Sequence, residues 1–230
     1  MTSTVGLLQS PVSSLQSFWR STIGKKLVMA LTGLVFVGFV LVHMLGNLQL
    51  FAGPSRFNGY SRLLRHDLVE FTWLVRVTLL AAVTLHVLAA WQLTRRGWSA
   101  RDRDYERYER QAATYASRTM RWGGVYLLVF IVYHLMHFTL GWVHPAFDPE
   151  GAYGNVILGF RTTWVVLFYL GAMAFLALHL YHGVWAMFRT VGIARPTPTP
   201  LERRLSLAVA IVVAGGFSLV PLAVWLGFVR

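Results

Sequence analysis

Cysteine is absent from this sequence of 230 residues. Its absence excludes disulfide bonds, thioether attachment of a haem and cysteine-ligated iron–sulfur clusters within the chain. Any metal chemistry must therefore rest on histidine, of which the sequence has eight.

Charged residues are also scarce, at 13% of the chain, while 56% of the residues are hydrophobic. A soluble domain typically has about 25% charged residues. No stretch between the hydrophobic runs is long enough to bury a core of its own. We therefore expect an integral membrane protein whose residues 1–230 form one transmembrane domain.

Five hydrophobic runs are long enough to cross a bilayer, because a spanning helix needs roughly 20 apolar residues. The fold class predicted is an all-α membrane protein, a bundle of five transmembrane helices. The expected spans cover residues 27–52, 71–94, 122–143, 162–188 and 205–228.

Basic residues divide unevenly between the two sides of these spans. Three precede the first span, eight lie in the segment 95–121 and four separate the fourth span from the fifth, against five on the other side. Because basic residues gather on the cytoplasmic side, the N-terminus is expected in the cytoplasm and the C-terminus outside. The net charge of +12 thus indicates topology, and nucleic acid is not an expected partner. The segment 95–121 mixes both signs, which fits either a solvated helix or a docking surface for a soluble partner.

Aspartate and glutamate are missing from the interiors of the spans, and Glu70 sits only at the outer edge of the second. A proton pump or an ion-coupled transporter normally needs a buried carboxylate. Transport is therefore disfavoured.

The spans instead contain histidine. His43, His86, His134 and His179 lie in four different spans, and an ionisable side chain in hydrocarbon is costly and usually functional. With a rise of 1.5 Å per residue, His43 and His134 lie roughly 20–25 Å from the inner boundary, and His86 and His179 roughly 14–15 Å. The four histidines thus form an outer pair and an inner pair.

Each pair joins two helices, which is the arrangement that a haem with two axial histidines needs in a helical bundle. We therefore expect two b haems, ligated by His43 with His134 and by His86 with His179. A haem with both axial positions filled transfers electrons and does not bind oxygen. Arg76, inside the second span, is expected either to extend to the outer surface or to neutralise a haem propionate.

Two of these ligands have neighbours that compete for the role. His137 follows His134 by three residues and His182 follows His179 by three, so each neighbour shares a helical face with its rival. Depth barely separates them. The rivals are alternatively candidates to contact haem propionates, backbone or a quinone.

The histidine segments together resemble the cytochrome b subunit of succinate dehydrogenases and fumarate reductases, of the single-chain, five-helix, two-haem kind. The resemblance covers nearly the whole chain. It rests on the segments 21–26, 29–33, 43–48, 85–87, 133–135 and 179–185, which read STIGKK, MALTG, HMLGNL, LHV, YHL and HLYHGVW.

This resemblance implies that His134 and His179, rather than His137 and His182, are ligands. It also implies a flavoprotein and an iron–sulfur protein docked on the cytoplasmic face of a prokaryotic inner membrane. Electrons would pass from succinate through the inner and the outer haem to menaquinone, or in reverse. Some two-haem relatives carry a proton-conducting glutamate where this chain has Ala177, so that proton path is not expected here.

The quinone site has two candidate positions. An outer cluster of His66, Asp67 and Glu70 could exchange quinone protons, although an ordinary solvated loop is the simpler interpretation. An inner alternative uses Ser21, Thr22 and Lys25, next to the iron–sulfur partner.

Two other functions compete with this one. The chain could be the cytochrome b of a hydrogenase or formate dehydrogenase, whose span counts and histidine distributions usually differ. It could also be a non-redox membrane anchor with structural histidines.

Overall fold

The computed structural model describes residues 11–99, 115–192 and 199–230, and every regular element in these residues is a helix. The elements are α1 (Pro11–Arg20), α2 (Thr22–Leu48), η1 (Gln49–Ala52), α3 (Pro54–Arg62), η2 (Leu63–Asp67), α4 (Val69–Ser99), α5 (Tyr115–His134), η3 (Leu135–Thr139), α6 (Ala152–Gly159), α7 (Thr163–Thr190) and α8 (Pro200–Trp225). Most of the mixed-charge segment 95–121, namely residues 100–114, lies outside the described residues.

In the described part of the chain, five helices are long and apolar enough to cross a membrane, which confirms the predicted all-α bundle of five spans. They cover Thr22–Ala52, Val69–Ser99, Arg118–Thr139, Thr163–Thr190 and Pro200–Trp225. The chain is therefore a multi-pass membrane protein.

Five of the predicted boundaries differ by four or five residues from those in the structure. The first, third and fifth spans begin at Thr22, Arg118 and Pro200 rather than at residues 27, 122 and 205, and the ends of the second and third spans also differ. The second span continues to Ser99 because its arginines remain helical, with Arg95 lying over the ring of Trp91 at 5.1 Å. The third span stops at Thr139 and not at residue 143. There the chain turns through Gly141, whose φ of 72° belongs to the left-handed region that favours glycine.

Polar side chains fix the beginnings of two of the spans. Ser21 caps α2, its hydroxyl accepting a 2.8 Å hydrogen bond from the main-chain N–H of Gly24. Thr199 and Glu202 form a capping box at the start of α8. Such caps satisfy N–H groups that have no partner within the helix.

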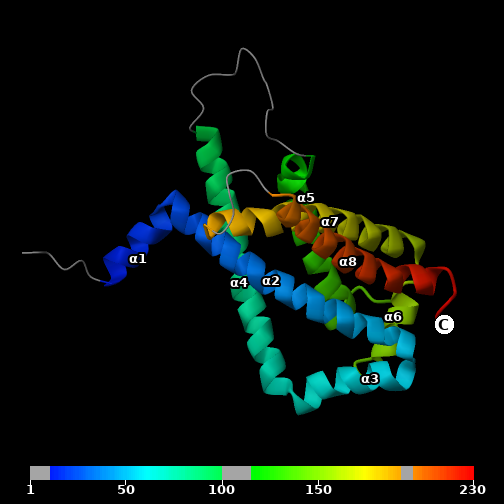
Figure 1. Cartoon of the computed structure of the whole chain (residues 1–230). Helices are drawn as coiled ribbons and strands as arrows, with labels where there is room; N and C mark the ends of the chain where they lie inside the picture. The colour runs from blue at the N-terminus through cyan, green and yellow to red at the C-terminus, as the bar shows by residue number, and fades with distance from the viewer. Residues whose placement is uncertain (1–10, 100–114, 193–198) are drawn as a thin grey trace, which may run out of the picture.

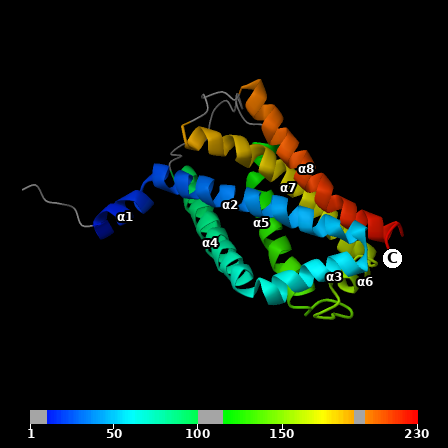
Figure 2. The ribbon, with the colours of Figure 1, turned by 60° about the horizontal axis from the view of Figure 1, so that its bottom comes forward.

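Three of the long helices form the centre of the bundle. In Figures 1 and 2, α8 lies along α7, and α2 runs beside both. Leu180 of α7 packs there against Ala210 and Val213 of α8, with Leu41 of α2 against the same cluster. The other two spans attach from outside, α4 to α2 and α5 to α7.

The two ends of the bundle differ in structure. One end, called the α1 end, contains the beginnings of α2 and α8 and the close of α4 and α7. The other, called the α3–α6 end, contains two short helices that the sequence did not predict, together with the C-terminus (Figure 2). Tyr153 of α6 joins them, since its N–H donates to Asn58 Oδ1 at 2.8 Å and its hydroxyl donates to the carbonyl of Arg230 at 3.2 Å.

Candidate functional site

The predicted outer pair of histidines meets between α2 and α5. The ring centroids of His43 and His134 lie 5.9 Å apart, with the ring planes at 78°. Phe39 stacks on His43 at 5.2 Å, and Phe130 stacks on His134 at 5.7 Å. Because each phenylalanine lies one turn before its histidine on the same helix, local sequence spacing alone positions these rings.

The predicted inner pair meets between α4 and α7. The ring centroids of His86 and His179 lie 6.2 Å apart, with the planes at 48°. Phe36 of α2 meets the edge of His86 at 5.7 Å. A Cβ added to Gly33 would have His86 Cε1 as its nearest neighbour, at 3.9 Å, so this glycine places bare backbone beside the imidazole.

The two rival histidines have other surroundings. His137 is buried, with its ring 4.1 Å from that of Phe138 and 5.2 Å from that of His144. His182 lies against Trp185 at 5.6 Å. His134 and His179 are thus the members of each rival couple that face a histidine of another helix.

Two hydroxyl groups meet the Nδ1 atoms of this site, and sequence reasoning missed both. Thr32 Oγ1 lies 2.9 Å from His86 Nδ1. Tyr169 Oη lies 3.3 Å from His134 Nδ1 and 3.1 Å from His137 Nδ1. A usable signal was present for Tyr169, because a tyrosine in the middle of an apolar span needs a partner for its hydroxyl. Thr32 gave no such signal, since a threonine can bond to its own helix.

The histidine pairs suit a metal that brings most of its own ligands. A metal–imidazole bond is about 2 Å long, so two imidazoles on opposite sides of one metal have centroids about 6 Å apart. Both measured separations agree with that value. In the part of the chain that the structure describes, no group of three or more histidine or acidic side chains is placed to hold an ion. Two nitrogens in a dry bundle fit the axial ligands of a haem, whose macrocycle supplies the other four.

Ser21 and Lys25 form hydrogen bonds at the junction of α1 and α2. The hydroxyl of Ser21 donates to the carbonyl of Phe18 at 2.8 Å besides capping α2. Lys25 is buried, and its Nζ donates to the carbonyls of Trp19 at 2.7 Å and Arg20 at 3.4 Å. Their predicted contacts with a quinone or a haem propionate stay predictions.

Arg76 lies on the exposed face of α4, its guanidinium 5.0 Å from the centre of the Trp73 ring. A guanidinium over an indole ring is a cation–π contact, and the predicted extension of Arg76 to the outer surface stays a prediction. A propionate contact stays a prediction.

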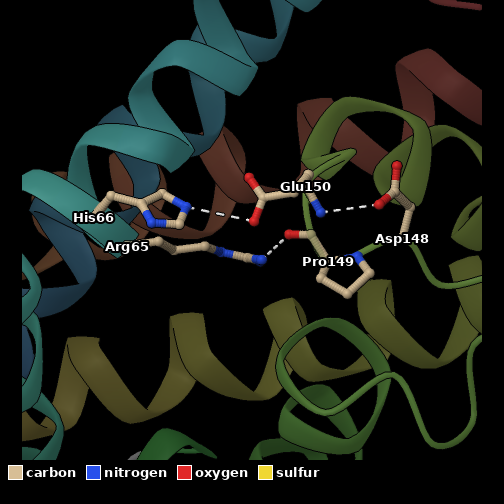
Figure 3. Close-up of polar contacts among 5 residues, drawn as sticks. All are labelled: Arg65, His66, Asp148, Pro149 and Glu150. Carbon is tan, nitrogen blue, oxygen red and sulfur yellow. Dashed lines mark hydrogen bonds and ion pairs between the residues drawn. The ribbon is translucent and has the colours of Figure 1, made fainter.

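Of the predicted outer cluster of His66, Asp67 and Glu70, His66 contacts the loop before α6. His66 Nε2 lies 3.4 Å from Glu150 Oε1, with both side chains 59% exposed. The neighbouring Arg65 donates to the carbonyl of Pro149 (Figure 3). Within this loop, the main-chain N–H of Glu150 donates to Asp148 Oδ1 at 3.0 Å (Figure 3). His66 and Arg65 of η2 thus connect this segment to the surface loop before α6.

Comparison with known protein families decides the classification. Residues 97–225 match the model of the succinate dehydrogenase/fumarate reductase transmembrane subunit. The chain belongs to this family. No curated protein and no solved structure matched the chain.

A succinate dehydrogenase/fumarate reductase transmembrane subunit associates with the catalytic subunits of an oxidoreductase at the membrane, so the family match favours this function over the hydrogenase and formate dehydrogenase alternative. The matched residues contain His134 and His179 but begin after His43 and His86. The pairing of all four histidines therefore rests on the ring geometry.

Proposed function

We propose that this subunit is a dihaem cytochrome b that anchors succinate:quinone oxidoreductase and passes electrons from its iron–sulfur partner to menaquinone. The observation that carries the proposal is the meeting of two histidine pairs, at 5.9 and 6.2 Å, from four different helices. His43 and His134 would hold one haem and His86 and His179 the other. The bound haems would supply one-electron transfer across the bilayer.

The helices themselves contribute position and exclusion of water. Each pair takes one histidine from a central helix and one from a helix attached outside, so the pairs form only when the bundle closes. Aromatic side chains of Phe36, Phe39 and Phe130 lie against the imidazoles. An apolar shell of this kind lowers the local dielectric and thereby tunes a metal centre.

The orientation proposed follows from the basic residues. In the described part of the chain, lysines and arginines gather at the α1 end. We place this end in the cytoplasm, where the flavoprotein and iron–sulfur partners would dock. The pair His86 and His179 would then be nearer to those partners. The pair His43 and His134 would be nearer to the α3–α6 end.

The haem content of histidine variants tests this proposal. The complex purified with haem available should contain two b haems per chain of this subunit by pyridine haemochrome. His134→Ala and His179→Ala should each lose one haem, because a single remaining axial ligand binds haem weakly. Optical redox titration of the same variants would show which spectral component belongs to which pair.

His137→Ala and His182→Ala are the matched controls, since each removes an imidazole three residues away on the same helix. Both should retain two haems. A wild-type complex without haem absorbance would overturn the proposal. Loss of haem in the controls but not in the ligand variants would reassign the ligands.

A further inference from the structure

Each histidine pair has one imidazole held by a hydroxyl group from a neighbouring helix. In the inner pair it is His86, whose Nδ1 meets Thr32 Oγ1 at 2.9 Å. In the outer pair it is His134, whose Nδ1 meets Tyr169 Oη at 3.3 Å. The Nδ1 of His179, by contrast, is buried without a hydrogen-bond partner in the described part of the chain.

The Thr32 hydroxyl also lies within hydrogen-bond distance of two carbonyls of its own helix. Thr32 Oγ1 donates to the carbonyl of Val28 at 2.7 Å, with the carbonyl of Met29 at 3.2 Å as a second acceptor. Since a hydroxyl has only one proton, a Thr32 hydroxyl that donates to one of these carbonyls accepts from His86 Nδ1. The proton of His86 then lies on Nδ1, which leaves the lone pair of Nε2 free for a metal.

For His134, the hydroxyl of Tyr169 is shared with a second histidine, His137. One hydroxyl oxygen meets Nδ1 of both His134 and His137, in a site where Tyr169 and His137 are 6% and 1% exposed. The single hydroxyl proton can satisfy only one of two accepting nitrogens. If His134 donates from Nδ1, Tyr169 is free to donate to His137, and only His134 then has the Nδ1-protonated form that leaves Nε2 bare.

The two holding residues are placed crosswise in the bundle. Thr32 lies on α2, which also carries His43 of the opposite pair. Tyr169 lies on α7, which also carries His179 of the opposite pair. Each of these two central helices thus supplies a histidine to one pair and a hydroxyl to the other.

We propose that Thr32 and Tyr169 are positioning residues that hold His86 and His134 in the Nδ1-protonated form and fix their ring orientation, each for one haem only. The proposal rests on the proposed function, in which these histidines bind iron through Nε2. An imidazole that donates from Nδ1 is a more basic ligand and stabilises the oxidised metal. Removing the acceptor should therefore raise the midpoint potential of that haem.

Two nearly isosteric substitutions test the proposal in the purified complex. Thr32→Val should raise the midpoint potential of the inner haem and leave that of the outer haem unchanged. Tyr169→Phe should raise the midpoint potential of the outer haem and leave that of the inner haem unchanged. The effect expected is about a tenfold change in the relative stability of the two oxidation states, which corresponds to about 59 mV for one electron. The low-spin ferric EPR signal, which reports the relative orientation of two axial imidazoles, should change for the same haem.

Each variant is the control for the other, and Thr32→Ser restores the hydroxyl and should restore the inner potential. A shift of both haems in either variant, or of neither, would overturn the proposal. So would an inner shift that Thr32→Ser does not reverse. If the wild-type complex contains two haems and these shifts fail, the proposed function stands and the positioning role does not. A wild-type complex without haem would overturn both.

Discussion

At the scale of single residues, Gly46 shows how closely the site is packed against the α3–α6 end. Gly46 is buried on α2, three residues after His43, and the ring of Tyr60 from α3 lies across it. A Cβ at this position would lie 2.8 Å from Tyr60 Oη and 2.9 Å from Cε1. These distances are too short for non-bonded carbon and oxygen atoms, so the ring would have to move.

Gly46→Ala should therefore destabilise the subunit by about 1–3 kcal/mol through overpacking. The measurement is the midpoint of thermal denaturation of the detergent-solubilised complex, which should fall by several degrees. Gly59→Ala is the matched control, because a Cβ there meets nothing within 4 Å. Since alanine favours a helix over glycine by about 1 kcal/mol, the control should be neutral or slightly stabilising. Equal losses in both variants would contradict this interpretation of Gly46.

At the scale of elements, the junction between α1 and α2 depends on cations that hold carbonyl groups. Lys25 Nζ donates to the last carbonyls of α1, and Arg96 at the end of α4 donates to the carbonyl of Arg20 at 2.6 Å. Carbonyls at the end of a helix lack partners within it. These two side chains from other helices therefore set the direction in which α1 leaves the bundle.

Lys25→Met should loosen α1, because the carbonyls of Trp19 and Arg20 lose a charged donor while the apolar stem remains. A spin label at Ser17→Cys on α1 measures this, and the absence of native cysteine leaves a single labelling site in the subunit. The label should become more mobile in Lys25→Met. The exposed neighbour provides the control, since Lys26→Met should leave the label unchanged. An unchanged spectrum in Lys25→Met would show that other contacts hold α1.

The elements also show where prediction from sequence succeeds and where it stops. The five spans were predictable because each is a long apolar run, and the pairing of His43 with His134 followed from helix rise and direction. The turn at Gly141 was missed, because a local φ of 72° leaves no mark on hydropathy. The contact of Tyr169 with His134 and His137 depends on the rotation of α7 about its own axis, which residue depth does not specify.

At the scale of the whole molecule, the distribution of charge predicts how the bundle sits in the membrane. Fifteen of the 21 lysine and arginine residues precede the first span or lie in the sequence segments that join the second span to the third and the fourth to the fifth. Positive charge resists transfer across the membrane during insertion. We therefore expect the α3–α6 end to face outward.

Single cysteines placed at the two ends measure this orientation. Ser55→Cys at the start of α3 and Ser99→Cys at the end of α4 both replace exposed serines. In intact spheroplasts, a membrane-impermeant maleimide should label the first variant and not the second. Labelling of Ser99→Cys alone would reverse the orientation and place the pair His43 and His134 on the cytoplasmic side.

The five spanning helices form a central group of three and two further helices attached at its outside. The central group is α2, α7 and α8, while α4 packs against α2 and α5 packs against α7. His86 and His134 belong to the attached helices α4 and α5, and their opposite histidines belong to the central group. If α4 or α5 moved away from the centre, one histidine pair would open while the central group and the other pair stayed in place. A flat cofactor could then enter from the side, one histidine pair at a time, without unfolding of the whole bundle.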